Sequence, residues 1–404
     1  MTSKLDVTTL LPVAGIRTAT GCANFKKPNR RDLVIFELAE GTKTAAVFTR
    51  NTFCAAPVHI AKRHRLAKPT RYLLINTGNA NAGTGEQGMR DSQRCCQLIA
   101  AQTGCDPEQV LPFSTGVIGE PLQVNKFEQA IPDVIARLSE NTWKDAAYGI
   151  MTTDTVAKGL SRQIRLDGTS ITLTGIAKGS GMIRPDMATM LAYLATDVDI
   201  SQTLLQQCLN EAVNRSFNRI TVDGDTSTND ACILMATGQA GVSIQSAESE
   251  HYRLFADTVA EICEELAKAM VRDGEGATKL ITIEVNGGRD AAECLQVAYT
   301  IGHSPLVKTA FFASDPNWGR ILAAVGRAGL VELDINALHI YLDDVCIVSN
   351  GGRDPAYTEQ QGQRVMDKSE IKIRVELARG KADERIWTCD FSYDYVKINA
   401  EYRT

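Results

Sequence analysis

Apolar and polar residues follow short periodic patterns along the chain, and these patterns predict a mixture of strands and helices. Runs of β-forming residues that end at glycine, asparagine or charged residues predict strands at 31–38, 44–50, 71–78 and 278–288. Helical spacing of apolar residues predicts helices at 86–104, 201–217 and 251–273. Two further segments predict hairpins, at 338–352 and 369–392. With no internal repeat or low-complexity linker, the mixture predicts an α+β or sandwich architecture.

Residues 160–179 (LSRQIRLDGTSITLTGIAKG) have the clearest local pattern. Apolar and polar residues alternate on both sides of Asp167-Gly168, a dipeptide typical of two-residue hairpin turns. The second predicted strand continues into GIAKGSGMIRPDMATMLAYLATDV at 175–198. There, glycines and a proline precede Thr189, which begins an apolar run. A glycine-rich turn followed by threonine does not match the common phosphate-binding patterns.

The charge of the chain argues against a polyanionic or membrane-surface partner. Its 404 residues include 43 basic and 48 acidic side chains, which gives a formal net charge of -5. No long run carries one sign, so the sequence indicates neither nucleic-acid nor membrane binding. A small-molecule partner is the better expectation.

Cysteine usage and the N-terminal residues predict a soluble cytoplasmic protein. The eleven cysteines are an odd number, and they are scattered from Cys22 to Cys389 without a repeating pair spacing. We interpret them as reduced, mostly buried thiols. The N-terminus carries Asp6 and its apolar run breaks at Pro12, unlike a signal peptide. No apolar segment approaches the roughly 20 residues that a membrane helix needs.

Three segments partly match familiar binding-site motifs, but each lacks a residue or a spacing that its motif requires. Lys178 precedes the glycines of "GSG", whereas a Walker loop needs its lysine after them, so a flexible strand connection is an alternative interpretation. His59 and His64 lack a second pair of metal ligands, which favours a basic surface segment. Residues 223–230 (DGDTSTND) lack the glutamate that a calcium loop has at its twelfth position, so they predict a polar turn that could line a site.

Histidine chemistry is also poorly supported. The chain has only five scattered histidines and no G-x-S-x-G elbow. An acyl-transfer enzyme with this sequence would need a base other than histidine.

A threonine at a newly formed chain end needs no second side chain as its base. Cleavage before Thr189 would place a hydroxyl and an α-amino group on one residue, and an α-amino pKa of about 7.7 to 8.0 lies close to working pH. Ala188 supplies the small preceding residue. The alternative is that Thr189 simply begins the buried strand TMLAYLATDV, and the residues alone leave both interpretations open.

Motifs along nearly the whole chain resemble those of the ornithine acetyltransferases, also called glutamate N-acetyltransferases, of arginine biosynthesis. Beside KGSGMIRPDMATMLAYLATD these are NTGNANAGTG at 76–85, STGVIG at 114–119, MTTDT at 151–155, SFNRITVDGDTSTND at 216–230, RDGEGATK at 272–279, DPNWGRI at 315–321 and the closing INAEYRT. Gly83 departs from the "NACTG" of many relatives. Many motifs in the family's order are more specific than any single glycine loop.

The resemblance implies a fold and a processing event. It implies an α+β, N-terminal-nucleophile-like sandwich of sheets and helices, in a topology shared with self-processing aminopeptidases. The bond between Ala188 and Thr189 would be cut autocatalytically, giving an α chain (1–188) and a β chain (189–404) that share one core. The chains would associate as an α2β2 heterotetramer. No cofactor is implied, although acetyl-CoA is a possible second acetyl donor.

The resemblance also implies the chemistry and the site residues. Thr189 would take the acetyl group from N2-acetylornithine and pass it to glutamate, with Thr115 and Gly116 as the oxyanion hole. From the residues alone, these two would form a simple turn after the strand VLPF. The residues that match the family's substrate pocket are Thr152, Lys178, Thr189, Glu275, Asn399 and Thr404. We expect Lys178 to pair with the substrate α-carboxylate and Glu275 with an ammonium group.

Two other functions remain open from the sequence. An amidase or aminopeptidase of the same topology would use the same threonine but release the acyl group to water. A binding protein without enzymatic activity would keep the core and would not be processed.

Overall fold

The computed structural model describes residues 5–26, 28–184 and 190–401. The chain forms two compact units. Unit 1 consists of Met1–Asn218 with Asp225–Met270, and unit 2 consists of Arg219–Gly224 with Val271–Thr404. The predicted cleavage site, Ala188 and Thr189, lies outside the described residues, as does Thr404.

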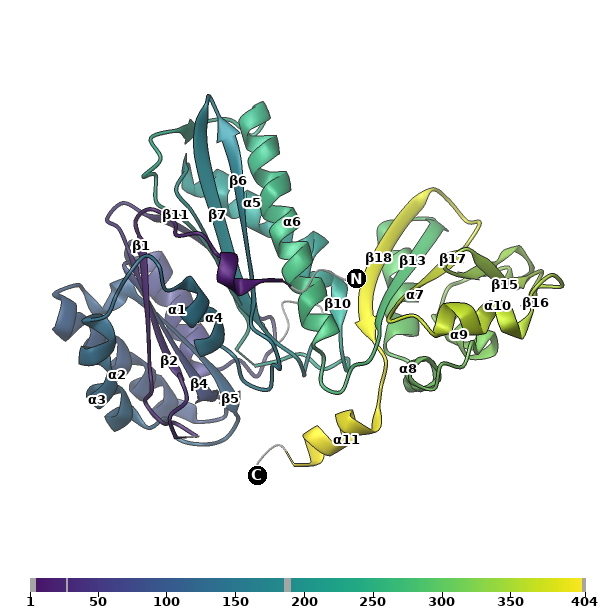
Figure 1. The fold of residues 1–404 in the computed structure, drawn as a ribbon, viewed down its shortest axis with the longest axis horizontal. Coiled ribbons are helices and arrows are strands. Elements are labelled where there is room, and N and C mark those ends of the chain that lie inside the picture. Colours follow the sequence, from purple (N-terminus) through teal and green to yellow (C-terminus); the bar gives the residue numbers. More distant parts are fainter. Residues whose placement is uncertain (1–4, 27, 185–189, 402–404) are drawn as a thin grey trace. The chain divides into compact units, whose positions relative to one another are not determined.

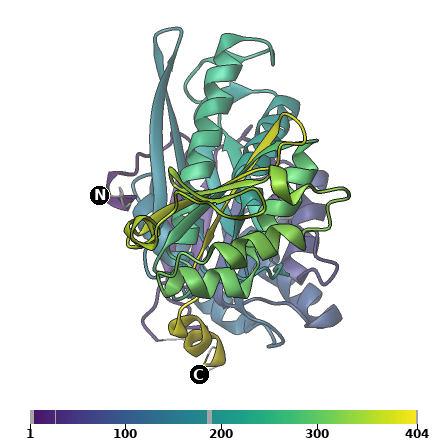
Figure 2. The same ribbon diagram turned by 90° about the vertical axis from the view of Figure 1, so that its right-hand side faces the viewer.

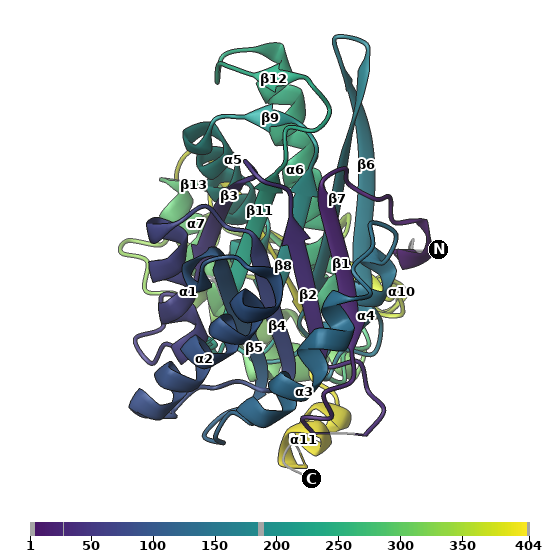
Figure 3. The ribbon, with the colours of Figure 1, turned by 90° about the vertical axis from the view of Figure 1, so that its left-hand side faces the viewer.

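Unit 1 contains two main sheets. The first has the strand order β1 (Ile16–Gly21), β2 (Leu33–Leu38), β4 (Tyr72–Asn79), β5 (Val110–Val117). The second has the order β3 (Lys43–Phe48), β11 (Ala231–Ala236), β8 (Leu191–Thr196), β7 (Thr169–Lys178), β6 (Lys158–Leu166). A short pair, β9 (Asp199–Ile200) and β12 (Ser243–Ile244), stands apart from both. Figure 3 shows these strands with the helices around them.

Six α-helices accompany these sheets in the described part of unit 1. They are α1 (Ala56–Ala67), α2 (Gly85–Thr103), α3 (Val124–Ile135), α4 (Trp143–Gly149), α5 (Gln202–Arg215) and α6 (Glu250–Arg272), whose last residues belong to unit 2. Local signals set some of the ends. The Ser201 hydroxyl accepts from Leu204 N at the start of α5, and Gly104, with φ 74°, ends α2.

The layers of unit 1 follow from which apolar faces meet. Phe36, Phe113 and Tyr193 fill the core between the two sheets. The centroid of the Tyr193 ring lies 5.4 Å from that of Phe36 and 5.4 Å from that of Phe113. Helices α2 and α3 cover the other face of the first sheet through side chains such as Ile99 and Phe127. Helices α5 and α6 lie on the second sheet (Figure 1). The predicted α+β class, with sheets between helices, is confirmed.

The hairpin predicted at 160–179 is also confirmed. Strands β6 and β7 pair antiparallel, with Lys158 opposite Ala177 at one end and Leu166 opposite Thr169 at the turn. Asp167 and Gly168 both have positive φ, 49° and 81°, as a two-residue turn of the primed type requires. Strand β7 then pairs with β8, so that Lys178 lies opposite Leu191. Residues on both sides of the Ala188-Thr189 bond therefore belong to one sheet and one core.

Unit 2 is built on one seven-stranded sheet. Its order is β10 (Ile220–Thr221), β18 (Ala382–Cys389), β13 (Leu280–Gly288), β17 (Glu370–Glu376), β14 (His339–Leu342), β15 (Val345–Ser349), β16 (Gly352–Arg353). The helices are α7 (Ala291–Gly302), α8 (Pro305–Phe312), α9 (Trp318–Gly326), α10 (Glu359–Met366) and α11 (Tyr393–Ala400). Side chains such as Val297, Phe311 and Val325 pack α7, α8 and α9 onto the sheet. Figures 1 and 2 show these helices beside the strands of unit 2.

The prediction of a hairpin at 369–392 is wrong. Strands β17 and β18 do not pair with each other, because β13 lies between them, parallel to β17 and antiparallel to β18. The connection crosses the end of β13, where the N–H groups of Arg379 and Gly380 both donate to the carbonyl of Gly287 at 2.8 Å. A Cβ on Gly380 would lie 2.2 Å from the carbonyl oxygen of Gly288, so this crossing needs glycine.

Within the described ranges, no helix is long and apolar enough to cross a membrane.

Candidate active site

The two residues predicted to form the oxyanion hole lie inside a strand. Thr115 and Gly116 are part of β5, so the expectation of a turn after VLPF is wrong. Gly116 has φ 138°, and a Cβ there would lie 2.3 Å from the carbonyl carbon of Gly78 on β4. Only glycine permits this close approach of the two strands.

Lys178 joins the two sheets of unit 1 at this point. It is the last residue of β7, and 4% of its surface is exposed. Its Nζ donates to Thr115 Oγ1 at 3.4 Å. A buried ammonium group therefore lies next to a residue predicted to stabilise a negative oxygen.

Asp154 lies at the centre of this cluster, and the sequence analysis gave it no role. Its Oδ1 accepts hydrogen bonds from Lys158 Nζ and from the backbone N–H of Gly179, each at 2.7 Å. Its Oδ2 accepts from the N–H of Thr152 at 3.0 Å. One carboxylate thus fixes a predicted pocket residue, Thr152, and the residue that follows Lys178. The MTTDT motif was the available signal.

The protonation state of Asp154 follows from its neighbours. Burial alone would raise the pKa of this carboxyl group. The positive charges of Lys158 and Lys178, with the hydrogen bonds from Lys158 and Thr152, outweigh burial and hold its pKa well below the ordinary value. Asp154 is therefore an anion at neutral pH, and it balances two buried cations.

The chain re-enters the described structure at Met190, directly after the predicted nucleophile. The N–H of Met190 donates to Asp230 Oδ1 at 2.9 Å. The amide of the neighbouring Asn229 donates to the carbonyls of Ala80 at 2.6 Å and Ser114 at 2.9 Å. The end of the polar segment 223–230 therefore connects the start of β8 with the strand that carries Thr115.

The asparagines of NTGNANAGTG support the same strand end. Asn76 Nδ2 donates to the carbonyl of Asn79, and Asn76 Oδ1 accepts from Ser114 Oγ at 2.6 Å. Asn81 has φ 47° and donates to the carbonyl of Gly88 at 3.0 Å. These buried amides replace regular strand pairing where the backbone bends beside Gly116.

In unit 2, two predicted pocket residues contact each other. Glu275 is nearly buried, with 7% of its surface exposed, in the loop after α6. Asn399, on α11, donates from Nδ2 to Glu275 Oε2 at 2.9 Å. The structure thus pairs Glu275 with Asn399 in unit 2, and it gathers Thr115, Lys178 and the Thr152 backbone in unit 1.

The histidine segment is not wholly a basic surface. His59 is exposed on α1, but His64 is buried, and its Nδ1 lies 2.9 Å from the carbonyl of Val110. Among the described residues, no three histidine, cysteine, aspartate or glutamate side chains form a group that could hold a metal ion.

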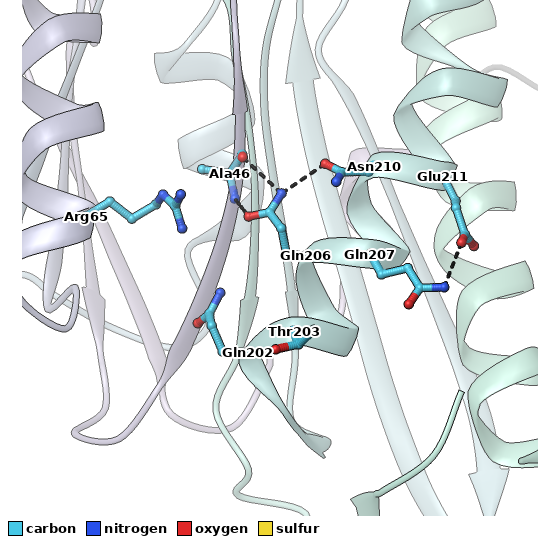
Figure 4. Close-up of a pocket in the computed structure, with 8 residues that line it drawn as sticks. All are labelled: Ala46, Arg65, Gln202, Thr203, Gln206, Gln207, Asn210 and Glu211. Carbon is cyan, nitrogen blue, oxygen red and sulfur yellow. Dashed lines mark hydrogen bonds between the residues drawn. The ribbon is translucent and has the colours of Figure 1, made fainter. Parts of the chain in front are cut away.

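A separate cavity of about 750 Å³ lies elsewhere in unit 1, at the edge of the second sheet (Figure 4). It is lined by Ala46, Arg65, Gln202, Thr203, Gln206, Gln207, Asn210 and Glu211. Gln206 bonds both backbone groups of Ala46, at 3.2 and 3.1 Å, and Gln202 does the same at Thr44. These side chains satisfy the free edge of β3, so the cavity belongs to edge protection and contains none of the predicted site residues.

A model of the ArgJ family matches residues 17–404. The arginine biosynthesis bifunctional protein ArgJ of Pseudomonas fluorescens is 57% identical over 397 residues, 98% of each chain. That of Pseudomonas syringae pv. tomato is 56% identical over 396 residues, again 98% of each. A crystal structure of ArgJ from Bacillus halodurans is 39% identical, with a TM-score of 0.49, and covers 52% of this chain and 97% of its own. The family model and the two Pseudomonas relatives confirm the family resemblance of the motifs.

Proposed function

Because the chain belongs to the ArgJ family, we propose that it transfers the acetyl group of N2-acetylornithine to glutamate, as an acyltransferase of arginine biosynthesis. The observation that carries this proposal is the family match over residues 17–404. That range includes the quoted motifs that contain Thr115, Lys178 and Glu275. The products are ornithine and N-acetylglutamate.

The proposed reaction passes through an acetyl ester of Thr189, the new chain end after cleavage from Ala188. Thr189 Oγ attacks the acetyl carbonyl, and its own α-amine accepts the hydroxyl proton. When the tetrahedral intermediate collapses, the C–N bond breaks and the amine returns the proton to departing ornithine. The amine of glutamate then attacks the ester, its proton passes through the same α-amine to Thr189 Oγ, and the C–O bond breaks. The chemistry needs no cofactor.

Thr115 and Gly116 would stabilise the oxyanion of each intermediate. This role is supported by their rigid setting, because Gly116 abuts the backbone of β4 and Thr115 accepts from Lys178. Donors that need no rearrangement stabilise a developing charge most effectively. The positive charge of Lys178 would add to this effect while it pairs with a substrate carboxylate.

Substrate binding would involve further residues, which we assign from the family motifs. They are Thr152, Lys178, Thr189, Glu275, Asn399 and Thr404. The amide of Asn399 orients the Glu275 carboxylate, which suits Glu275 to bind the side-chain ammonium of ornithine.

Processing and assembly belong to the same proposal. Strand β7 precedes the cleavage site and β8 follows it, and the two pair in one sheet, so the α and β chains would remain together after cleavage. We propose a cytoplasmic α2β2 heterotetramer, with a native mass about twice the 43.9 kDa of one chain.

Acetyl-CoA is proposed as a second acetyl donor. The Pseudomonas relatives are named bifunctional, and acetyl transfer from acetyl-CoA to glutamate would reach the same acetyl-threonine ester. Acetyl-CoA is a substrate in this scheme.

The test is an assay of the purified enzyme with three substrate sets. Acetylornithine with glutamate should give N-acetylglutamate with parallel double-reciprocal lines, as a ping-pong reaction does. Acetylornithine alone should release little acetate, whereas an amidase or aminopeptidase would release it freely. Acetyl-CoA with glutamate tests the second donor. Thr189→Ala should remain a single chain and inactive, and an intact wild-type chain with full activity would refute the mechanism.

A further inference from the structure

Lys308, on α8 of unit 2, is buried, with 1% of its surface exposed. Its Nζ donates to Thr388 Oγ1 at 2.8 Å and to the backbone carbonyl of Cys389. Its own carbonyl accepts from the N–H of Phe391 at 3.3 Å, and its ammonium group lies 4.4 Å from the centroid of the Phe391 ring. Lys308 thus holds the end of β18 through both side chain and backbone.

A buried ammonium group is costly, so its bonds need an explanation. Burial lowers the pKa of Lys308, while Cys389, Asp390 and Asp223 favour its charged form. Packing alone does not require this charge, because methionine would fill a similar volume. The charge of Lys308 is therefore better explained by the polar groups that it bonds than by the space that its side chain fills.

One side of this cluster supports α11. The Phe391 ring stacks on the ring of Tyr395, with centroids 4.5 Å apart and an interplanar angle of 18°. None of the eight residues of α11 is buried. The helix is therefore held by a few specific contacts, which include the stacking of Tyr395 on the Phe391 ring and the hydrogen bond from Asn399 to Glu275. Lys308 fixes the first of these through Phe391.

The other side of the cluster supports the loop that carries Glu275. Asp390 Oδ1 accepts from the N–H groups of Thr278 and Lys279, each at 2.8 Å, and Oδ2 accepts from Thr278 Oγ1 at 2.6 Å. Ser392 Oγ donates to the carbonyl of Gly276 at 2.6 Å. The segment 388–392 therefore joins the loop to α11.

We propose that Lys308 is a positioning residue for substrate binding, which fixes segment 388–392 so that Asn399 can hold the Glu275 carboxylate in place. This inference rests on the proposed function, since it requires Glu275 and Asn399 to bind substrate. Lys308 does not touch substrate. It acts through two residues that do, and a displacement of about 1 Å at such residues can cost on the order of 10²-fold in rate.

The test compares Lys308→Met with Asn399→Ala and the double variant. Lys308→Met keeps the length of the side chain and removes its charge. We expect kcat/KM for acetylornithine to fall about 10- to 100-fold, mostly through KM, while self-cleavage still occurs. The double variant should be little worse than Asn399→Ala alone, because both changes disturb the same arrangement of Glu275.

Arg379→Met is the matched control. Arg379 is also a cation of unit 2, with 8% of its side chain exposed, and it bonds Glu293 and the carbonyls of Val331 and Glu332. It lies at the C-terminal end of β13, whereas the loop with Glu275 precedes the N-terminal end of that strand. Its effect, whatever its size, should add to that of Asn399→Ala. Hydrogen exchange of residues 391–401 gives a readout independent of activity, and exchange there should be faster in Lys308→Met than in Arg379→Met.

The outcomes separate the two proposals. If Asn399→Ala keeps the wild-type kcat/KM, the assignment of Asn399 in the proposed function is wrong, and the role of Lys308 is lost with it. If Asn399→Ala is impaired but Lys308→Met is additive with it, or leaves exchange of 391–401 unchanged, only the Lys308 inference is overturned. Should Lys308→Met fail to fold, Phe391→Leu replaces it with the same expectations, because it removes the ring platform and keeps the lysine.

Discussion

Replacing Asp154 with asparagine should destabilise unit 1 strongly, even though the two side chains have nearly the same shape. The carboxylate accepts three hydrogen bonds, from Lys158, Thr152 and Gly179, and it is fully buried. Asparagine has one acceptor oxygen, so its NH2 group would face a backbone N–H. The substitution also leaves the ammonium groups of Lys158 and Lys178 without their carboxylate.

The size of the loss follows from the burial of the ion pair. Breaking a buried pair by removing one partner costs about 3–5 kcal/mol, because the remaining charge stays desolvated. For a domain of about 150–250 residues, 1 kcal/mol corresponds to about 2–4 °C in Tm, so we expect a decrease of roughly 6–20 °C. Scanning calorimetry of wild type and variant measures it.

The matched control is Asp145→Asn. Asp145 pairs with Arg31 on the surface, where both side chains are more than a third exposed, and such pairs contribute about 0–1 kcal/mol. A further variant, Asp154→Asn with Lys158→Met, should recover part of the lost stability, because it removes one of the two cations that the Asp154 carboxylate balances. If Asp154→Asn melts within about 1 °C of wild type, or no lower than Asp145→Asn, the reasoning about the buried cluster is refuted.

The contribution of Asp154 to stability should decrease as the pH falls. The native pKa of Asp154 is lowered, so its contribution to stability is present above the unfolded value of about 3.9 and is lost as pH falls through the native pKa. The stability difference between wild type and Asp154→Asn should therefore be constant near neutral pH and shrink below about pH 4. Urea titrations at several pH values would show it, and a difference that grows on acidification would contradict this assignment.

Three further predictions concern separate parts of the molecule. Thr115→Ala should lower kcat about 10²- to 10³-fold with little change in KM, and a change confined to KM would show that Thr115 only positions substrate. Gln206→Leu should cost about 1–3 kcal/mol in urea unfolding, because it leaves the backbone groups of Ala46 unpaired, whereas Gln207→Leu should cost much less. Deleting residues 399–404 should leave self-cleavage intact and reduce acetyl transfer about 10²-fold, and unchanged kcat/KM values for both substrates would rule out a role for these residues in binding.

Local patterns predicted the elements well but not always their neighbours. The two strands that the Asp167-Gly168 turn joins pair directly with each other, and no other strand lies between them. The segment 369–392 has the same alternation, yet β13, from nearly a hundred residues earlier, lies between its two strands. Alternation reports which face of a strand is buried, and it carries no information on which strand lies beside it.

The site shows the same division between residues that motifs reveal and residues that only geometry reveals. Thr115, Lys178 and Glu275 were predicted because the family motifs single them out. Asp154 lay within one of those motifs without an assigned role, since its partner Gly179 is 25 residues away and depends on how β7 ends. From the residues alone, Thr115 and Gly116 were also predicted to form a turn, because a glycine after a strand usually marks a turn. Here the glycine serves a close approach between two strands.

The buried cations explain why the supporting residues are harder to predict than the residues they support. A lysine in a sequence is expected at the surface, and only its burial next to particular acceptors shows another role. Lys158 is four residues from Asp154, a spacing that on a helix would mean a weak surface pair, but here the pair is buried beside Lys178. Lys308 is 81 residues from Cys389, and no local pattern connects them. In unit 1 the Asp154 carboxylate, balanced by buried ammonium groups, fixes the backbone of Thr152 and of the residue after Lys178, and in unit 2 the Lys308 ammonium group bonds the backbone at the end of β18. Loss of activity on substitution there would reflect displaced substrate contacts, and it should therefore appear together with a loss of stability, whereas Thr115→Ala should reduce activity alone.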